Sequence, residues 1–560
     1  MSGPAEAVAR QAVKALAGSP EASARWRKRY KAFSLVAGVL ALATLCAGLR
    51  WGVMVAGGAD SYGYISQAGY WQRGSVVVRE DVIRPSPWPG AALTWSPLGY
   101  RPSPNQPGAI VPLYAPGLPL LMALGQLIAG FCGAFLVVPL CGALTIWLTY
   151  LLGLRVFDAP GIAVWSAGLV AASPVFLYQL MNAMSDVPVT AAWTLALVLT
   201  LGRRPLAAGV AMSVAIAIRP NLAPLAGVSI VWTMLSEGSL GGRRSAVHAA
   251  LRVTAGVAIS VIGIAVFNAR VYESPLTSGY GTTADLYAVG FFSTNARQFA
   301  AWMAEAETPV VALAVLFFVA PGFLPRAKVP FARLLLGGSI LVVLLSYLFY
   351  RPFDVWWYLR FLLPMWPVMM LLTAAALETI ARRWTRSAYP IAIAAAVALV
   401  AWHGVRTAID RSVFDLARSE RRYIDVARFI AGHTDPDAVI LSVQHSGSLR
   451  LYAGRLTLRF DALDPLWLDR ALAHLQSIGR RPYFVLDGGE VDAFRRRFGG
   501  ESQSGTLDWP PLATLHGTIA VYDPADRGSN TPPLAIAGTR GPQHGLCDRP
   551  QIWPPVLRMK

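Results

Sequence analysis

Long apolar segments recur along this chain and limit what it can fold into. Runs of about 16–24 apolar residues follow one another from Phe33 to about Ile409, and each can cross a hydrocarbon core of ~30 Å. We count about twelve runs, which predicts a polytopic α-helical membrane protein of about 11–13 spans. The first run is too long and begins too late for a cleaved signal peptide, and no small-x-small cleavage site follows it.

The distribution of charged residues and of cysteines argues against some classes of function. The net charge of +18 would suit a nucleic-acid-binding protein, yet Lys and Arg are scattered through short loops and the last third of the chain. Such an excess is typical of cytoplasmic loops near anionic lipid head groups, so we expect membrane lipids as partners and no nucleic acid. Cys46, Cys132 and Cys141 lie in apolar runs and Cys547 lies in the tail, a spacing that indicates neither a metal site nor a disulfide framework.

Basic residues predict the orientation of the chain in the membrane. The polar N-terminus, 1–32, ends in a cluster of Lys and Arg, which should stay in the cytoplasm and send the first span outward. Asp60 then lies at the start of a long outer loop, 57–113. Ten prolines between Arg84 and Leu120 exclude regular helix for most of this connection.

Basic pairs in later loops extend this topology. They predict that the 271–307 loop, the 351–358 loop and everything after about Ile409 lie on the outer side. The stretch 114–154 must then cross the membrane an odd number of times, although it holds two apolar runs. One of the two is therefore expected to be a half-crossing or an interfacial helix. We expect residues 33–409 to form the transmembrane domain.

The composition changes in the last third of the chain, where helical and strand patterns alternate. This alternation is typical of a small α/β domain. We expect that domain at 410–525 on the outer side, followed by an irregular Pro/Gly-rich tail at 526–560. The predicted elements are helices at 419–433, 464–479 and 490–498, strands at 438–443 and 482–487, and a hairpin around 511–523.

An acidic residue stands at the mouth of the first span, in 57-GGADSYGYISQAGYW-71. The apolar residues that follow, Tyr64 among them, fall at helical spacing and predict a helix from Ser61 with one apolar face on the membrane surface. Asp60 stands where an N-cap residue belongs, so the local sequence leaves capping and catalysis equally open. The two roles are compatible, because a capping carboxylate has a fixed orientation.

Two further segments carry candidate substrate-binding residues. Tyr114, in 112-PLYAPGLPLL-121, lies where the chain re-enters the membrane and could equally be an interfacial anchor. Asp186, in 181-MNAMSDVPVTAAW-193, lies between two apolar runs. A helix N-terminus favours a carboxylate in any case, so a capping role is the simpler interpretation of Asp186.

Arginines flanked by apolar residues are harder to explain as structural. Arg219 lies between two apolar runs, and Arg360 lies immediately before one, next to a Trp–Trp–Tyr group that includes Trp357 and Tyr358. An ionised side chain deep in the bilayer costs ~2.5–3.5 kcal/mol on insertion scales, so it usually snorkels or faces a polar cavity. Arg351 can snorkel, whereas Arg219 and Arg360 are candidates for binding an anion.

An outer carboxylate, interfacial arginines and aromatic rings together suit sugar transfer from a polyprenyl-phosphate donor. Phosphate is a good leaving group, so a single carboxylate can suffice as the base on the acceptor hydroxyl, whereas a glycosidase commonly needs two carboxyl groups. Arginines would hold the departing phosphate. Aromatic side chains offer flat faces to the sugar or the isoprenoid.

The order of these motifs resembles the GT-C superfamily of integral-membrane glycosyltransferases. That superfamily includes protein O-mannosyltransferases, the aminoarabinose transferase of lipid A and RgtA/B/C/D-like bacterial transferases. The similarity covers roughly residues 33–370. The matching segments are 60-DSYGYISQA-68, 114-YAPGLPLL-121, 184-MSDVPVTAAW-193, 219-RPN-221 and 356-WWYLRFLLP-364.

The resemblance implies an inverting, lipid-phosphate-sugar-dependent transferase in the cytoplasmic (inner) membrane, with Asp60 as the catalytic carboxylate. The acceptor would be a glycan, lipid or protein hydroxyl. Many members have Asp-Glu at this point, whereas this chain has Asp60–Ser61 and no Asp-x-Asp in the loop. This departure argues against a metal, and no cofactor beyond the donor is expected. The residues expected to bind substrate are Tyr64, Tyr114, Asp186, Arg219, Trp357, Tyr358 and Arg360.

Three other functions stay open at this point. A transporter or flippase of a lipid-linked sugar would favour broken helices in paired halves, and the chain has no convincing internal repeat. A glycan polymerase or ligase of another fold, and an inactive scaffold, are the remaining alternatives. In the C-terminal domain, His445, Asp487 and Glu490 lie near strand ends, but they form no recognisable catalytic spacing. We expect a structural or acceptor-positioning role for that domain.

Overall fold

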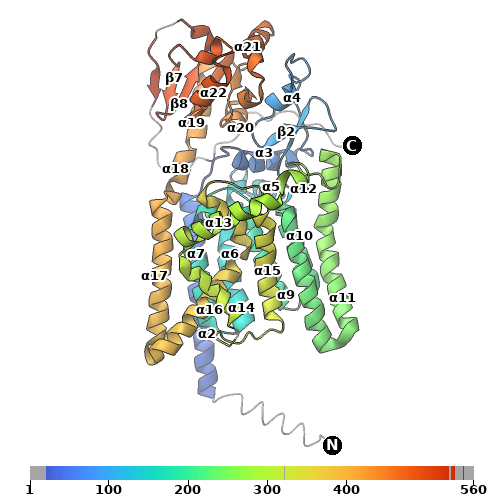
Figure 1. The fold of residues 1–560 in the computed structure, drawn as a ribbon, viewed down its shortest axis with the longest axis vertical. Helices are drawn as coiled ribbons and strands as arrows, with labels where there is room; N and C mark the ends of the chain where they lie inside the picture. Colours follow the sequence, from blue (N-terminus) through green and yellow to red (C-terminus); the bar gives the residue numbers. More distant parts are fainter. Residues whose placement is uncertain (1–19, 321, 529–530, 537–546, 548–560) are drawn as a thin grey trace, which may run out of the picture.

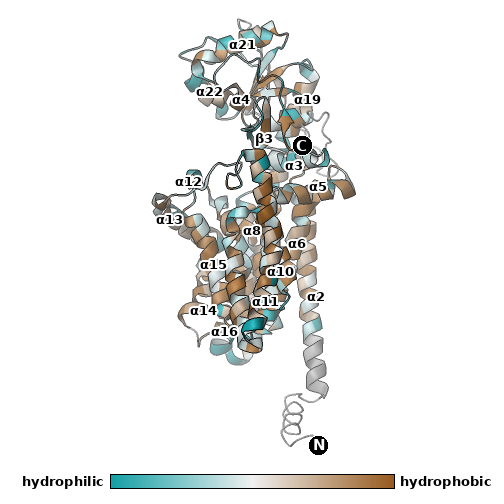
Figure 2. Ribbon diagram, turned by 90° about the vertical axis from the view of Figure 1, so that its right-hand side faces the viewer, coloured by the Kyte–Doolittle hydropathy of each residue, from teal (hydrophilic) through white to brown (hydrophobic). Residues whose placement is uncertain are grey.

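The computed structural model describes residues 20–320, 322–528, 531–536 and 547. Figure 1 shows a bundle of long helices, with a smaller part that contains both helices and strands stacked on one end of it. Hydrophobic residues dominate the bundle helices, and the upper part is mixed in polarity (Figure 2). A mostly helical architecture with apolar helices is therefore confirmed. Residues 1–19 of the predicted basic N-terminus lie outside the described residues, as does most of the predicted tail.

Among the described residues, four helical segments are long and apolar enough to cross a membrane, or up to six if each of two bent pairs is one span. Two of the four segments, Pro220–Tyr272 and Trp356–Asp410, fold back on themselves in Figure 1. The first breaks at Gly242, whose φ of 76° suits glycine because a Cβ would be strained there. The second breaks at the short turn Arg386–Ala388. The predicted total of about 11–13 spans stays a prediction.

The helices of the bundle begin and end as follows. The long apolar helices are α2 (Pro20–Trp51), α6 (Gly133–Phe157), α11 (Pro224–Tyr272), α16 (Trp366–Thr385) and α17 (Tyr389–Asp410). Shorter ones are α5 (Gly117–Ala129), α7 (Pro160–Ala172), α8 (Pro174–Leu180), α9 (Asp186–Leu201), α10 (Pro205–Ile218) and α15 (Ala332–Leu348). The connection between α11 and α15 contains α12 (Thr283–Leu286), α13 (Phe292–Trp302) and α14 (Leu316–Val319).

The two apolar runs in 114–154 form helices of unequal length. Helix α6 has 25 residues, whereas α5 has 13. At 1.5 Å per residue α5 reaches only ~20 Å, which is too short for a hydrocarbon core of ~30 Å. Its exposed apolar side chains include Leu124, Leu127 and Ile128. Helix α5 therefore has the length expected of the half-crossing or interfacial segment.

The 57–113 connection begins with α3 at the upper end of the bundle and continues beside the C-terminal part (Figure 1). It contains α3 (Asp60–Gln72), α4 (Ala91–Thr94) and a three-stranded antiparallel sheet in the order β1 (Val78–Arg79), β3 (Ala109–Pro112), β2 (Tyr100–Pro102). The expectation that α3 lies with one apolar face on the membrane surface is wrong. Every residue from Ser61 to Tyr70 is buried, because α3 lies between α5 and the C-terminal part of the chain.

The C-terminal part contains a six-stranded mixed sheet in the order β5-β4-β6-β8-β7-β9. Strand β4 pairs in parallel with both neighbours, while β8 is antiparallel to β6 and β7. The strands are β4 (Val439–Leu441), β5 (Leu456–Leu458), β6 (Pro482–Asp487), β7 (Ala513–Leu515), β8 (Ile519–Tyr522) and β9 (Leu534–Ile536), and the helices include α18 (Leu416–Glu420), α19 (Arg422–His433), α20 (Ser446–Ser448), α21 (Leu468–Ser477) and α22 (Glu490–Phe498).

These elements match the alternation read from the sequence, with two added strands. Strand β5 is the first, and it follows a one-turn π-helix, Leu449–Ala453. The hydrophobic periodicity of the sequence indicated neither element. Strand β9 lies inside the tail that we expected to be irregular, because it pairs in parallel with β7 along a sheet edge that only the fold creates. The expectation for the tail is therefore wrong at 534–536.

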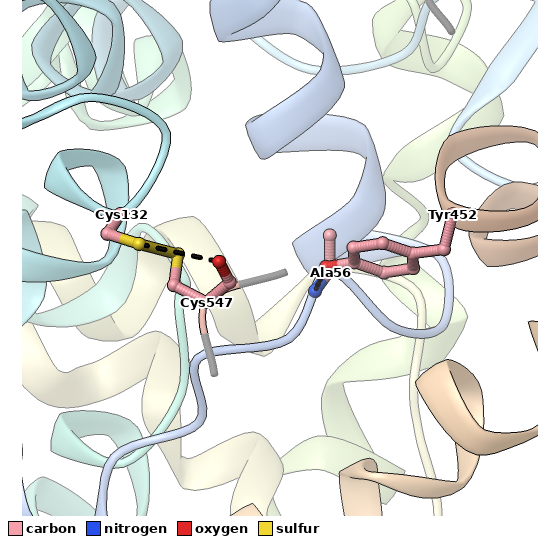
Figure 3. The surroundings of a disulfide bond; sticks show 4 residues. All are labelled: Ala56, Cys132, Tyr452 and Cys547. Carbon is pink, nitrogen blue, oxygen red and sulfur yellow. Dashed lines mark hydrogen bonds between the residues drawn. A yellow bond between two sulfur atoms is a disulfide. The ribbon is translucent and has the colours of Figure 1, made fainter. Parts of the chain in front are cut away.

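A disulfide joins Cys132, between α5 and α6, to Cys547 near the end of the chain, with Cα atoms 5.4 Å apart (Figure 3). The cysteine positions in the sequence had indicated no disulfide framework, and the structure corrects that interpretation with this one bond. The two cysteines are separated by 415 residues, one in an apolar run and one in the tail, so their spacing in the sequence carries no sign of pairing. The disulfide ties Cys547 to the connection between α5 and α6 of the helix bundle.

Candidate functional site

Asp60 is the first residue of α3, and it does not cap that helix. The N-cap residue is Ala59, and no side chain caps the helix start. The Asp60 carboxylate instead accepts a hydrogen bond of 2.8 Å from the Tyr114 hydroxyl. Both terminal nitrogens of Arg360 lie 3.3 Å from its other oxygen. The Asp60 side chain is 29% exposed, so its carboxylate is open to a ligand although both oxygens have partners.

Tyr114 reaches Asp60 from the segment between β3 and α5. Its ring packs against the Tyr64 ring, with centroids 4.4 Å apart, and against the Tyr280 ring at 5.9 Å. Gly63 makes room for this ring, because a Cβ there would lie 2.0 Å from a Tyr114 ring carbon. Burial and the neighbouring Asp60 carboxylate raise the pKa of the Tyr114 hydroxyl well above its usual range. The hydroxyl therefore keeps its proton and acts as a donor.

A second carboxylate is paired within the bundle. Asp186 begins α9, and its carboxylate accepts a hydrogen bond of 2.6 Å from Arg219. The capping interpretation is wrong here as well, since no side chain caps α9. Arg219 lies in the non-helical link between α10 and the turn Pro220–Leu222, and it also donates to the Ser185 hydroxyl at 3.0 Å. The Tyr64 hydroxyl donates to the same Ser185 oxygen at 3.3 Å and so joins the two carboxylate pairs.

Arg360 enters the site from the 3₁₀ segment Trp356–Met365. Besides Asp60, one terminal nitrogen donates to the Met184 sulfur at 2.9 Å. Its guanidinium carbon lies 5.0 Å from the Tyr358 ring centroid and 5.5 Å from that of Phe361. The Arg219 guanidinium carbon lies 5.8 Å from the same Phe361 ring, so both arginines flank one aromatic ring.

The two arginines keep unused donors. Within the described part of the chain, Nη1 of Arg219 and Nε of Arg360 are buried and have no hydrogen-bond partner. A buried donor without a partner costs free energy, and an anionic ligand with several oxygens can supply one. The guanidiniums bind carboxylates with some nitrogens and leave others available. This arrangement suits a phosphate group.

The structure brings six of the seven expected substrate-binding residues, together with Asp60, into one chain of contacts. Tyr358 joins it through Arg360 and also stacks on Phe353, with ring centroids 4.0 Å apart. Trp357 lies at its edge and stacks on Tyr178, with centroids 5.5 Å apart and ring planes 7° from parallel. The contacting residues are Tyr64, Tyr114, Asp186, Arg219, Tyr358 and Arg360.

Four residues of the site had not been expected from the sequence. Met184, Ser185 and Phe361 lie inside motifs already quoted, but a thioether, a hydroxyl and a lone ring carry no signal that separates them from packing residues. Tyr280 lies in the 271–307 loop, where nothing in the local sequence indicates that its ring reaches Tyr114. Among the described residues, no group of three or more His, Cys, Asp or Glu side chains could hold a metal ion.

The polar residues noted in the C-terminal part form a separate cluster at the carboxyl ends of β4 and β6. Glu490 accepts hydrogen bonds from the backbone N–H groups of Gln444, which follows β4, and Asp487, the last residue of β6, at 2.8 and 3.0 Å. Burial raises the pKa of Glu490 to about 7. His445 is fully buried with Nε2 3.4 Å from the Asp487 carboxylate, and burial lowers its pKa.

Comparison of the whole structure with solved structures identifies the architecture. The chain is similar to ArnT from Cupriavidus metallidurans bound to undecaprenyl phosphate, with a TM-score of 0.56 and 14% identity over 89% of this chain and 97% of that one. The chain has the GT-C fold. The apo state of ArnT gives a TM-score of 0.53 at 14% identity, covering 89% of this chain and 98% of ArnT.

The same fold extends to a second kind of transferase. The apo oligosaccharyltransferase of Archaeoglobus fulgidus is similar with a TM-score of 0.50 and 13% identity, over 90% of this chain and 75% of that one. No family model and no curated protein sequence matches this chain. The GT-C resemblance read from motif order is therefore confirmed by three-dimensional structure, at a level of identity that sequence comparison does not reach.

Proposed function

We propose that this GT-C protein is a glycosyltransferase that moves a sugar from a polyprenyl-phosphate-linked donor to a hydroxyl group of a glycan, lipid or protein. The observation that carries this proposal is the environment of Asp60. A single, partly exposed carboxylate contacts Tyr114 and Arg360, and Tyr64 and Ser185 link it to a second arginine, Arg219. The similarity to ArnT, whose structure contains undecaprenyl phosphate, supports the same donor class.

Arg219 and Arg360 would bind the donor phosphate. Each has a buried nitrogen without a hydrogen-bond partner among the described residues, and phosphate oxygens fit such donors. Asp186 holds Arg219 in place through a bond of 2.6 Å. As the sugar leaves, negative charge grows on the phosphate, and these guanidiniums stabilise that charge where it develops.

Asp60 would act as the general base. Its carboxylate takes the proton from the acceptor hydroxyl while the hydroxyl oxygen forms a bond to the anomeric carbon, and the phosphate leaves with the electron pair of the broken bond. One direct displacement inverts the anomeric centre. Because phosphate leaves as an anion, no second carboxyl group is needed to protonate it. Tyr114 orients the carboxylate by donating to one oxygen.

The aromatic residues would line the path of the donor. Tyr64 and Tyr358 flank the carboxylate and the arginines, and they offer apolar faces beside the charged groups. Trp357, stacked on Tyr178 at the edge of the site, would contact the sugar or the first isoprene units. No metal and no cofactor take part in this proposal, since the donor carries its own leaving group.

The site would face the outer side of the cytoplasmic (inner) membrane, with the N-terminus in the cytoplasm and 33–409 as the multi-pass catalytic domain. The Cys132–Cys547 disulfide supports this orientation, because disulfides persist mainly outside reducing compartments. Cys132 follows α5, and α5 and α3, the helix that begins with Asp60, lie at the end of the bundle that carries the C-terminal part (Figure 1). The α/β domain at 410–525 would then be extracytoplasmic.

The test compares wild-type protein with Asp60→Asn in membranes supplied with a panel of labelled polyprenyl-phosphate sugars. We expect one donor to label an acceptor, and Asp60→Asn to lower the rate by ~10²–10⁴-fold, the usual contribution of a general base. Asp81→Asn is the matched control, because Asp81 lies in the same loop with its side chain 71% exposed and pairs only with Arg79 among the described residues.

Two outcomes would contradict the proposal. Equal labelling by wild-type and Asp60→Asn protein would mean that Asp60 is not the base. Movement of the labelled donor across the membrane without formation of a glycosidic bond would indicate a transporter of the lipid-linked sugar instead.

A further inference from the structure

The loop that carries Asp60 packs directly on the C-terminal α/β part. Gly57 lies against the Tyr423 ring of α19, where a Cβ would come within 2.2 Å of a ring carbon and 2.7 Å of a Glu420 carboxylate oxygen. Gly58 has a φ of +58° and faces the Tyr423 hydroxyl. Position 57 therefore needs glycine because the Tyr423 ring, from a distant part of the sequence, fills the space beside it, and position 58 favours glycine because of its positive φ.

A hydrogen bond fixes the residue just before these glycines. The backbone N–H of Ala56 donates to the Tyr452 hydroxyl at 2.9 Å (Figure 3). On the other side of Asp60, the Tyr62 ring covers Gly447, where a Cβ would lie 2.3 Å from a ring carbon. The C-terminal part thus contacts the chain both before and after the carboxylate.

The rest of the 57–113 loop also contacts the C-terminal part. Arg450 and Glu80 form an ion pair in which the side chains are only 5% and 4% exposed, and Arg450 also donates to the Trp95 carbonyl at 2.6 Å. The Leu98 N–H donates to the Ser446 hydroxyl at 3.0 Å. Buried charge pairs and backbone bonds of this kind hold one relative position, because a shift would leave charged or polar groups without partners.

Tyr423 is itself held by the polar cluster of the C-terminal part. Its ring lies 4.7 Å from the fully buried His445 ring and 5.0 Å from the Arg422 guanidinium carbon. The Asp487 carboxylate lies near both, 3.4 Å from His445 and 3.6 Å from Arg422. This cluster, at the carboxyl ends of β4 and β6, gives the ring a fixed place against Gly57.

We infer that Tyr423 and Tyr452 are positioning residues for Asp60, so that the α/β part completes the catalytic site. They touch Ala56, Gly57 and Gly58, two to four residues before the carboxylate, so a shift of these residues would move Asp60. The inference rests on the proposed transferase function. Since a displacement of ~1 Å in a catalytic group can cost ~10²-fold in rate, these contacts should control turnover rather than donor binding.

The test uses initial rates of sugar transfer at varied concentrations of the active polyprenyl-phosphate donor. Gly57→Ala pushes a methyl group into the Tyr423 ring, and we expect kcat to fall by ~10²-fold with the KM for donor nearly unchanged. Gly432→Ala is the matched control, because Gly432 lies in the same helix as Tyr423 and an added Cβ meets nothing within 4 Å. The double variant Gly57→Ala/Tyr423→Ala should recover part of the lost kcat.

A second variant tests the positioning role if the Gly57→Ala protein fails to accumulate. Tyr452→Phe keeps the ring and removes only the oxygen that accepts from Ala56, so it should fold and lower kcat by ~5-fold, the effect of one hydrogen bond. A kcat equal to wild type for Gly57→Ala and Tyr452→Phe overturns the inference. Wild-type protein that forms no product from any donor refutes the proposed function instead, so the two failures are distinguishable.

Discussion

The site contains two Asp–Arg pairs that differ in closeness and exposure. Asp186 and Arg219 are 2.6 Å apart, and their side chains are only 1% and 11% exposed. Asp60 and Arg360 are 3.3 Å apart, with side chains 29% and 14% exposed. The first pair is a tight, buried contact between the start of α9 and the non-helical link after α10, and the second lies where the outer loop meets the bundle.

The difference in distance and exposure indicates that the two Asp–Arg pairs have different roles. A carboxylate that is buried and closely paired is held by its partner and has little freedom to bind a proton from a substrate. A carboxylate with a longer contact and an open side can accept one. We therefore expect the Asp186–Arg219 pair to maintain the fold and aim a phosphate-binding guanidinium, and the Asp60–Arg360 pair to act in the chemistry.

Breaking each pair should affect stability very differently. Asp186→Asn leaves Arg219 as an uncompensated buried charge, so the free energy of unfolding should fall by ~3–5 kcal/mol. Asp60→Asn breaks the more exposed pair and should cost only ~0–1 kcal/mol. Thermal unfolding of both purified variants in the same detergent measures the contrast. Equal losses of stability in the two variants would contradict the assignment of a structural role to one pair and a catalytic role to the other.

Removing the donor to Asp60 sharpens the comparison. Tyr114→Phe keeps the ring that packs on Tyr64 but deletes a hydrogen bond to a charged group, so kcat should fall by ~10-fold with stability nearly unchanged. Steady-state transfer rates check this result. Tyr272→Phe is the control, because its buried hydroxyl donates to the nearby Pro112 carbonyl and not to the site. A similar fall in kcat for Tyr272→Phe would mean that local packing explains the effect.

The smallest effect is expected where the two pairs are linked. Ser185→Ala removes the hydroxyl that accepts from Arg219 and Tyr64 while it leaves the bond between Asp186 and Arg219 in place. We expect a loss of ~1 kcal/mol in stability and a rise of ~3-fold in the KM for donor. Donor titrations and thermal unfolding measure both. A loss as large as that of Asp186→Asn would show that the hydroxyl, and not the carboxylate, holds Arg219.

The charged residues of the site could be predicted because each stands at an unusual place in the sequence. Arg219 and Arg360 stand out among apolar runs, and Asp60 and Asp186 stand at helix starts. Their partners could not be predicted. Local sequence left capping and catalysis equally open for Asp60 and favoured a cap for Asp186, whereas the Asp60 carboxylate binds Arg360, 300 positions away. Capping is decided by backbone geometry within one turn, and here tertiary partners with full positive charge compete for the same oxygens.

The sequence by itself determined the class of this protein. Apolar runs of membrane length require helices, since the hydrocarbon core offers backbone groups no other partners, and the later alternation of patterns requires an α/β part. Only the tertiary structure decided that Cys132 meets Cys547, that residues Ser61 to Tyr70 of α3 are all buried, and that Tyr423 fills the space beside Gly57. Such contacts depend on the packing of segments hundreds of residues apart, and short-range periodicity carries no information about them.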